Sequence, residues 1–291
     1  MSRRNDLWLG WLLLFPTLFV LGMFTVLPAL ESLYLSLFDF NAFMTRKTFV
    51  GLSNYSMLLN SPEYWQSLWV TFYFVAFTAI PSVILALFVA SVLDANPFFR
   101  GILRTVFLLP VAVSSAMAAM LWIFLYNPTS GYLNFIIESF GFNGPNWLGD
   151  PQWAIPAVAL ASIWKELGFN VIFFLAGLAS VPTDLKEAAA LDGAGPVQVF
   201  RHVTLPILSP TVLFVSVISV LNAFQSFGQI HILTIGGPAG ATTTMVYNLY
   251  RDAFQNFQTG SASAQAVVLF IVMLVGTSIQ FRFARSRVHY R

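Results

Sequence analysis

The chain has 291 residues, of which 57% are hydrophobic and only 9% are charged, and its mean hydropathy is +0.75. A soluble domain usually carries about 25% charged residues, so a chain of this composition cannot cover its own surface in water. The absence of cysteine excludes disulfides, thiolate catalysis and cysteine metal sites. The three histidines, His202, His231 and His289, are too far apart in the sequence for a local metal-binding spacing.

Six apolar segments are long enough to cross the hydrocarbon core of a bilayer, which is about 30 Å thick and takes roughly 20 residues of helix. In chain order they are Leu9–Leu30, Gln66–Leu93, Thr105–Tyr126, Trp153–Leu178, Ile207–Phe227 and Ala262–Phe283. The first is too long for a signal peptide, and no small-residue cleavage site follows it. The sequence therefore predicts an all-α membrane bundle, with residues 1–291 forming a single transmembrane domain.

The basic residues predict the orientation, because cytoplasmic loops carry an excess of lysine and arginine. With the N-terminus inside, ten of the 14 basic residues lie on the inner side: Arg3, Arg4, Arg100, Arg104, Lys186, Arg201, Arg282, Arg285, Arg287 and Arg291. Arg46, Lys47 and Arg251 lie outside, and Lys165 lies within the fourth span. Both termini are therefore expected in the cytoplasm. The basic tail is expected to contact anionic membrane lipid, not nucleic acid.

The inner loop between the fourth and fifth spans, residues 181–206, differs from the rest of the chain. Signals typical of a helix N-terminus stand at its start: Pro182, a Thr183 or Asp184 cap, and Glu187. We therefore expect a short, alanine-rich helix over Leu185–Leu191.

The rest of this loop predicts a turn and a second helix. Gly193 and Gly195 turn the chain, and Pro196 begins a helix that is expected to end near Leu205-Pro206. The first helix carries three small side chains at 188–190, which let another surface approach closely, and charges at 186, 187 and 192. The pattern alone fits a docking helix and an amphipathic connector on the inner leaflet equally well.

The inner loop resembles the EAA loop of binding-protein-dependent ABC importers, on the residues Glu187-Ala188-Ala189, Gly193, Val203 and Leu205-Pro206. A valine where isoleucine is usual is a conservative departure. In that family the loop forms the coupling helix, which sits in a cleft of the ATPase subunit. The resemblance implies that an ABC ATPase dimer docks on the 181–206 loop through Glu187, Ala188, Ala189, Asp192, Gly193, Leu205 and Pro206.

Other stretches are similar to the carbohydrate-uptake, maltose-type branch of the family: Leu108-Leu-Pro-Val-Ala, Leu121-Trp-Ile-Phe, Gly236-Gly-Pro, Ala241-Thr-Thr-Thr and Tyr250-Arg. Within it, the endings Ser261-Ala-Ser-Ala-Gln and Gln280-Phe-Arg most resemble the first permease subunit of glycerol-3-phosphate importers. The resemblance implies a permease of the bacterial inner membrane that takes up a sugar, polyol or glycerol phosphate.

The resemblance also implies partners. These are a second permease subunit, the ATPase dimer and an extracytoplasmic solute-binding protein, for which Asn143, Asp150 and the Gly236–Thr244 loop are candidate contacts. A P-loop needs GxxxxGK[ST], whereas none of the three lysines follows a glycine. We therefore expect no catalytic residue, cofactor or metal in this chain, with ATP and Mg²⁺ bound by the partner ATPase.

The fourth span carries three polar residues and one aromatic residue on one broad helix face, at offsets of three, four and seven: Ser162, Lys165, Glu166 and Phe169. A charge at the bilayer centre costs about 2.5–3.5 kcal/mol, so it should face the bundle or a wet cavity. Lys165 and Glu166 point about 100° apart, so they cannot simply neutralise each other. They either hold helices together or contact solute. The resemblance favours solute, because this part of the span helps line the sugar site in maltose-type permeases.

The fifth span has a second polar stripe, formed by Asn222, Gln225, Ser226 and Gln229. Its amides suit solute hydroxyls, but they could equally join helices, a contribution of about 0.6 kcal/mol each. Two polar stripes on consecutive helices favour a solute pathway.

Two other classes of membrane protein fit the sequence less well than an importer does. An ion-coupled secondary carrier for a polar solute would use an intramembrane acid such as Glu166, but the sequence has no internal repeat, and the inner loop would have no role. An intramembrane protease would need an aligned Ser/His pair or two acids, and no histidine lies clearly within a span. The solute stays open between a neutral sugar, a polyol and a glycerol phosphate.

Overall fold

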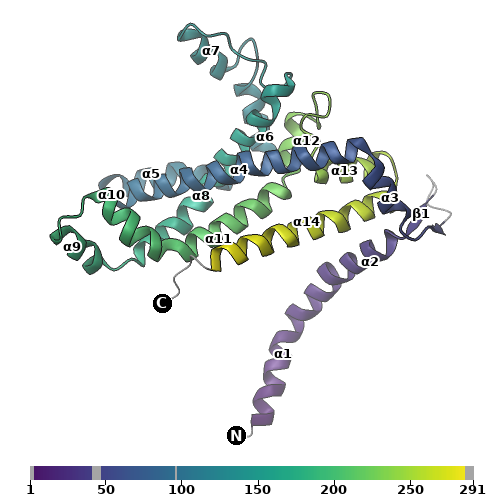
Figure 1. Cartoon of the computed structure of the whole chain (residues 1–291), viewed down its shortest axis with the longest axis horizontal. Coiled ribbons are helices and arrows are strands. Elements are labelled where there is room, and N and C mark those ends of the chain that lie inside the picture. The colour runs from purple at the N-terminus through teal and green to yellow at the C-terminus, as the bar shows by residue number, and fades with distance from the viewer. Residues whose placement is uncertain (1–2, 41–46, 96, 286–291) are drawn as a thin grey trace. The chain divides into compact units, whose positions relative to one another are not determined.

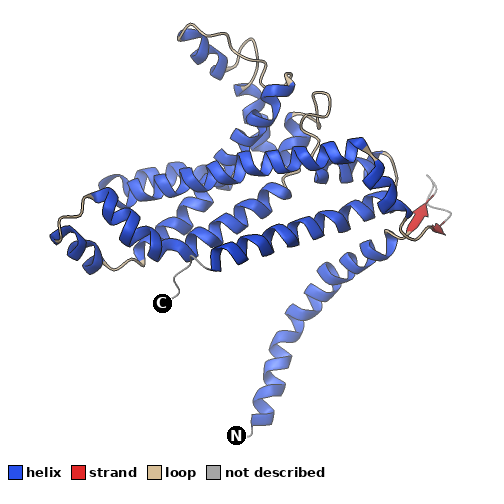
Figure 2. Cartoon of the chain, in the orientation of Figure 1, coloured by secondary structure: helices blue, strands red, loops and turns tan. Residues whose placement is uncertain are grey.

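The computed structural model describes residues 3–40, 47–95 and 97–285, so His289 and the basic residues Arg46, Arg287 and Arg291 lie outside the described residues. Helices dominate these residues, and their one sheet is a two-stranded hairpin (Figure 2). The chain divides into two compact units. The first is Met1–Tyr64 with Asn248–Ile271, and the second is Trp65–Tyr247 with Val272–Arg291.

The first unit contains the N-terminal span, the hairpin and a short helix. Its elements are α1 (Arg3–Leu21), the π-helix η1 (Gly22–Val26), α2 (Leu27–Leu35), β1 (Phe38–Phe40), β2 (Lys47–Phe49), α3 (Ser53–Asn60) and the π-helix η3 (Arg251–Gln255). The strands are antiparallel, with Phe38 opposite Phe49. Asn54 fixes the hairpin, because its Nδ2 donates to the carbonyl oxygens of Ser36 and Phe38 at 2.8 and 3.0 Å.

The second unit contains the elements that build the candidate sites. They are α5 (Pro97–Ala112), α6 (Ser115–Leu125), α7 (Tyr132–Ser139), α8 (Pro151–Ala179), α9 (Thr183–Leu191), α10 (Pro196–Val199), the π-helix η2 (Phe200–Thr204), α11 (Leu205–Phe224) and α12 (Gly228–Leu233). Three helices have residues in both units: α4 (Pro62–Ala95), α13 (Met245–Tyr250) and α14 (Thr259–Arg285). Figure 1 shows α9 beyond one end of the α4, α8 and α11 helices.

The described residues include five continuous helices that are long and apolar enough to cross a membrane: Gly10–Leu35, Pro62–Ala95, Pro151–Ala179, Pro196–Phe224 and Thr259–Phe283. A bent pair, Thr105–Ala112 with Ser115–Leu125, completes six when it is counted as one span. Each of the six predicted segments overlaps one of these spans. The all-α, six-span membrane fold is therefore confirmed.

The third predicted span, Thr105–Tyr126, is not one straight helix. Its two halves, α5 and α6, are bent by 110° at Val113 and Ser114. Pro110 has no N–H to donate to the α5 ladder, and Ser114 is extended, with its Oγ accepting from the Met117 N–H at 3.2 Å. This serine caps a new helix, so the local hydrogen bonding favours a break that apolar length alone did not reveal.

The fifth predicted span also needs correction, because the helix ends at Phe224 and not at Phe227. Gln225 leaves the helical conformation with φ −94° and ψ 6°, and a new helix, α12, begins at Gly228. The Ser226 hydroxyl donates to Gln229 Oε1 at 3.2 Å across this break. The predicted stripe from Asn222 to Gln229 therefore belongs to two helices and the turn between them.

The core of the second unit joins α4, α8 and α11. Fully buried residues of all three helices pack together: Ala86, Ala90, Leu93, Val171, Phe174, Leu178, Leu208 and Val215. Small alanines on α4 let the helices approach closely, as is usual inside membranes. Asn170 adds a polar link, because its Nδ2 donates to Ser82 Oγ at 2.9 Å and to Ser219 Oγ at 3.1 Å.

Candidate functional site

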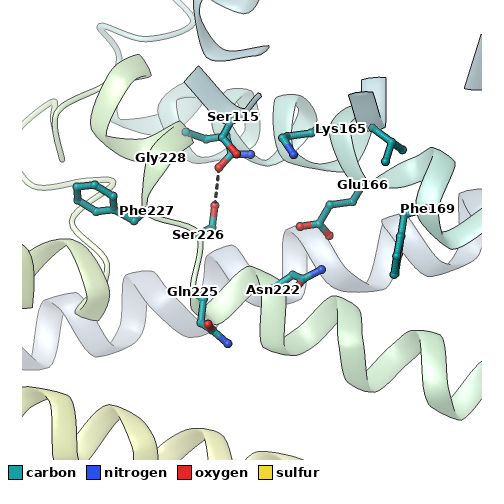
Figure 3. Close-up of a pocket in the computed structure, with 11 residues that line it drawn as sticks. Ser115, Lys165, Glu166, Phe169, Asn222, Gln225, Ser226, Phe227 and Gly228 are labelled. Atoms are coloured by element: carbon teal, nitrogen blue, oxygen red, sulfur yellow. Dashed lines mark hydrogen bonds between the residues drawn. The ribbon is translucent and has the colours of Figure 1, made fainter. Parts of the chain in front are cut away.

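A cavity of about 370 Å³ lies where two broken helices meet α8. Its lining residues are Val111, Ser115, Lys165, Glu166, Phe169, Asn222, Gln225, Ser226, Phe227, Gly228 and Gln229. Figure 3 shows Lys165 and Glu166 entering the cavity from α8, with Asn222 and Ser226 on its other side. We call this cavity the solute pocket, after the solute path predicted from the sequence.

The two helix breaks are what shape the solute pocket. Val111 and Ser115 stand on either side of the α5–α6 break, and residues 225–227 form the α11–α12 break. The starts of α6 and α12 lie against each other, since a Cβ added at Gly228 would be 3.3 Å from the Ser115 Cβ. A glycine at this position allows the close approach. Broken helices at such a site are common in membrane transport proteins, where irregular backbone lines a cavity.

The two titratable side chains of the solute pocket do not contact each other directly. Among the described residues, no ion pair joins Lys165 to Glu166, and the buried Oε2 of Glu166 has no hydrogen-bond partner. A buried acceptor without a partner costs about 1–3 kcal/mol, and more when it is charged. The pocket therefore offers an amino group, a carboxyl group and several amide groups to whatever enters it.

Seven of the eight residues predicted for the solute path line this one pocket: Lys165, Glu166, Phe169, Asn222, Gln225, Ser226 and Gln229. The eighth, Ser162, is 1% exposed, and its hydroxyl donates within α8 to the Val158 carbonyl at 2.9 Å. Whether these side chains contact solute stays a prediction. Sequence reasoning missed Val111, Ser115, Phe227 and Gly228, although the Ser114-Ser115 pair after Pro110 was a usable capping signal.

The inner loop forms a short exposed helix, as predicted. The helix α9 buries no residue, and Glu187, Ala188, Asp192 and Gly193 are exposed. Its C-terminus is a Schellman motif: the Gly193 N–H donates to the Ala190 carbonyl and the Ala194 N–H to the Ala189 carbonyl, each at 3.0 Å. Gly193 has φ +85°, the left-handed conformation that only glycine adopts without strain.

A second cavity, of about 390 Å³, lies between the C-terminal end of α9, α10 and η2. It is lined by Ala189, Asp192, Gly193, Ala194, Gln198, Val199, His202 and Val203. Three predicted coupling residues, at 189, 192 and 193, therefore share one concave surface. Leu205 and Pro206 are instead half-buried at the start of α11.

Two details of the predicted loop are wrong. Pro182 is the N-cap residue of α9, with no side-chain cap, so neither Thr183 nor Asp184 serves as the cap. The second helix does not end near Leu205-Pro206 but continues through η2 into α11.

Two of the π-helices, η1 and η2, have a common physical cause. Leu205 donates to the Phe200 carbonyl just before Pro206, and Leu27 donates to the Gly22 carbonyl just before Pro28. Proline has no N–H, and its ring clashes with the carbonyl four residues earlier. A wider turn ahead of the proline lets the helix continue.

Two of the predicted outer contacts, Asp150 and the Gly236–Thr244 loop, form hydrogen bonds within the chain. Asp150 caps α8, because its Oδ1 accepts from the Gln152 N–H at 2.9 Å. The Gly236–Thr244 loop is tied by its own hydroxyls, with Thr242 Oγ1 donating to the Gly237 carbonyl at 2.6 Å and Thr243 Oγ1 to the Gly236 carbonyl at 2.8 Å. Asn143 is exposed.

Comparison with known proteins defines the class of this protein. Residues 82–289 match the family described as binding-protein-dependent transport system inner membrane component. The chain belongs to this family and is a multi-pass inner-membrane permease of the ABC importer class. It is 41% identical over 285 residues to the sn-glycerol-3-phosphate transport system permease protein UgpA of Agrobacterium fabrum, with 97% of this chain and 96% of that protein covered.

A second relative agrees with this class, and two solved structures share the fold. The UgpA protein of Escherichia coli O157:H7 is 38% identical over 285 residues, covering 98% of this chain and 96% of the relative. The fold is similar to that of a bacterial ABC transporter involved in the import of the acidic polysaccharide alginate, with a TM-score of 0.84, 24% identity, and 97% and 96% of the two chains covered. The MetNI methionine ABC transporter gives a TM-score of 0.55 at 18% identity, covering 77% and 94%.

Proposed function

We propose that this chain is one of two permease subunits of an ATP-driven importer for a glycerol phosphate or a related phosphorylated polyol. The observation that carries the proposal is the solute pocket, where Lys165 lies among the amides of Asn222, Gln225 and Gln229. An ammonium group suits a phosphate, and amides suit hydroxyl groups. A volume of about 370 Å³ is large enough for a small polyol phosphate.

The near full-length similarity to two glycerol-3-phosphate permeases supports the same solute class. The chain contains no P-loop, so ATP and Mg²⁺ are assigned to a separate ATPase dimer that docks on α9. A second permease subunit would complete the pathway. A related alginate transporter has been solved with a periplasmic protein that carries bound sugar, which supports an outer partner that delivers solute to this chain.

Reconstitution of the complete importer tests this function. With ATP on the α9 side and the solute-binding protein on the other side, proteoliposomes should accumulate labelled glycerol-3-phosphate. Unlabelled glycerol-3-phosphate should compete for uptake, and maltose should not. Uptake that needs an ion gradient and ignores ATP would instead identify a secondary carrier. ATP-driven uptake of maltose alone would contradict the solute class while leaving the importer assignment intact.

The proposed orientation places both termini and α9 in the cytoplasm, and cysteine labelling tests it. Because the chain contains no cysteine, single substitutions need no altered background. Asn143→Cys should react with an impermeant maleimide added to intact cells. The matched variant Leu191→Cys, at an α9 side chain that is 89% exposed, should react only after the membrane is opened. The reverse labelling would contradict the charge argument and the roles of both loops.

A further inference from the structure

The helix α4 crosses the membrane as one continuous element of 34 residues, and it is linked to other parts of the second unit at both ends. One face of α4 is buried along the length of the helix. Most of the buried residues on this face are small: Ser67, Thr71, Thr78, Ser82, Ala86, Ala90 and Leu93. With the buried Phe74 between Thr71 and Thr78, their spacing of three to four residues places them on a single helix face. The part of this face from Ala86 to Leu93 packs against α8 and α11.

The outer end of α4 is bonded to the segment that follows the Gly236–Thr244 loop. The Met245 N–H donates to Thr71 Oγ1 at 2.8 Å, and the Thr71 hydroxyl donates to the Ser67 carbonyl at 2.7 Å. Thr71 and Met245 are each 1% exposed, so this contact is shielded from water. The loop is also held by its own threonine hydroxyls, and it is therefore expected to move together with α4.

The middle of α4 is joined to α8 and α11 by hydrogen bonds. Pro81 removes one backbone hydrogen bond from the helix interior and is a point where a helix can bend. At the next residue, Ser82 Oγ accepts from Asn170 Nδ2, which also bonds Ser219 on α11. This three-helix contact restrains α4 at the position where it would otherwise bend.

The inner end of α4 is linked to the coupling helix by charge. Asp94 Oδ2 lies 3.6 Å from Lys186 Nζ, with the two side chains 24% and 30% exposed. Because α9 buries no side chain, apolar packing does little to set its orientation. The Asp94–Lys186 ion pair directly joins an α9 side chain to α4.

We propose that Asp94 is a positioning residue: through Lys186 it aligns the coupling helix with α4, so that displacement of the outer loop reaches the ATPase through this helix. The inference rests on the proposed function, which assigns α9 to the ATPase contact and the Gly236–Thr244 loop to the outer partner. It goes beyond that function by naming the helix and the ion pair that connect the two surfaces.

Charge reversal in the complete reconstituted importer tests the inference. Asp94→Lys should lower the ATPase stimulation caused by the loaded solute-binding protein by about two- to fivefold, the range expected from a partly exposed ion pair. Basal ATPase activity and subunit assembly should be retained, because Asp94 lies outside the docking surface. Glu138→Lys makes the same charge change on the exposed part of α7 and should leave the stimulation unchanged.

Rescue separates positioning from a general loss of structure, since Asp94 takes part in at least one further interaction. The double variant Asp94→Lys with Lys186→Asp restores an ion pair of opposite sense and should recover most of the stimulation. Asp94→Glu should retain it as well.

Full stimulation in Asp94→Lys, or no recovery in both the swapped pair and Asp94→Glu, would overturn the inference. A wild-type importer without ATP-driven uptake would contradict the proposed function instead.

Discussion

Replacing Lys165 with methionine should reduce uptake of a phosphorylated solute by about 10- to 100-fold while the protein remains abundant in the membrane. The change keeps the length of the side chain but removes its charge and its donors. Charge-assisted hydrogen bonds contribute about 1.5–3 kcal/mol, and about 1.4 kcal/mol corresponds to a factor of ten. Uptake of glycerol-3-phosphate in proteoliposomes, normalised to the amount of inserted protein, measures the effect.

A structural role for Lys165 would give a different result. If Lys165 instead holds helices together, its replacement would destabilise the folded protein, and protein abundance would fall together with uptake. The matched variant Lys47→Met removes the same charge from the outer hairpin, where the ammonium lies 4.0 Å from the centre of the Phe38 ring. It should leave the solute affinity unchanged. Normal uptake by a normally abundant Lys165→Met protein would rule out the solute pocket.

Replacing Gly193 with valine should abolish most solute-stimulated ATPase activity without preventing membrane insertion. An added Cβ at Gly193 has open space, so the cost is conformational. At φ +85° an L-residue pays roughly 1–2 kcal/mol, and a β-branched side chain fits this region worst. The turn after α9 should therefore change, and the docking surface with it. Stimulated ATPase activity and uptake in the assembled importer measure the loss.

Two matched variants make the Gly193 result specific. Gly193→Asn should retain much more coupling, because asparagine tolerates the left-handed region at helix C-termini. Gly141→Val places the same residue at φ +83° with open space around its Cβ, but in the loop after α7. It should leave ATPase stimulation intact. Normal stimulation in Gly193→Val would show that this turn does not couple the ATPase to the pathway.

The membrane spans and the coupling helix are the features that the sequence predicted well. Long apolar runs leave a chain no alternative to helices within lipid, because every backbone polar group must be satisfied inside its own segment. The end of α9 was readable for a similar reason, since few residues other than Gly193 can close a Schellman turn. Its start was less readable, because a proline, a threonine and an aspartate in succession each permit a different first residue.

The solute pocket shows the limit of this reasoning. The sequence identified seven lining residues but placed Asn222 and Gln229 on one continuous helix face. They meet in the pocket because α11 ends at Phe224 and α12 begins at Gly228. A helix break depends on a balance between one lost ladder bond and new contacts, such as the one between Ser226 and Gln229. The length of an apolar segment in the sequence does not reveal that balance.

What the sequence determined by itself is the class of molecule: a six-span helical membrane protein with a short, alanine-rich helix predicted over Leu185–Leu191, which the structure places at Thr183–Leu191. Both follow from local properties, namely hydrophobic length and turn chemistry. Only the tertiary structure decided that the breaks after Ala112 and Phe224 come together against α8, and that Asp94 pairs with Lys186 across 92 residues of chain. Such contacts form between segments that are distant in the sequence. Each contact contributes little free energy, so the complete fold decides which of the possible contacts form.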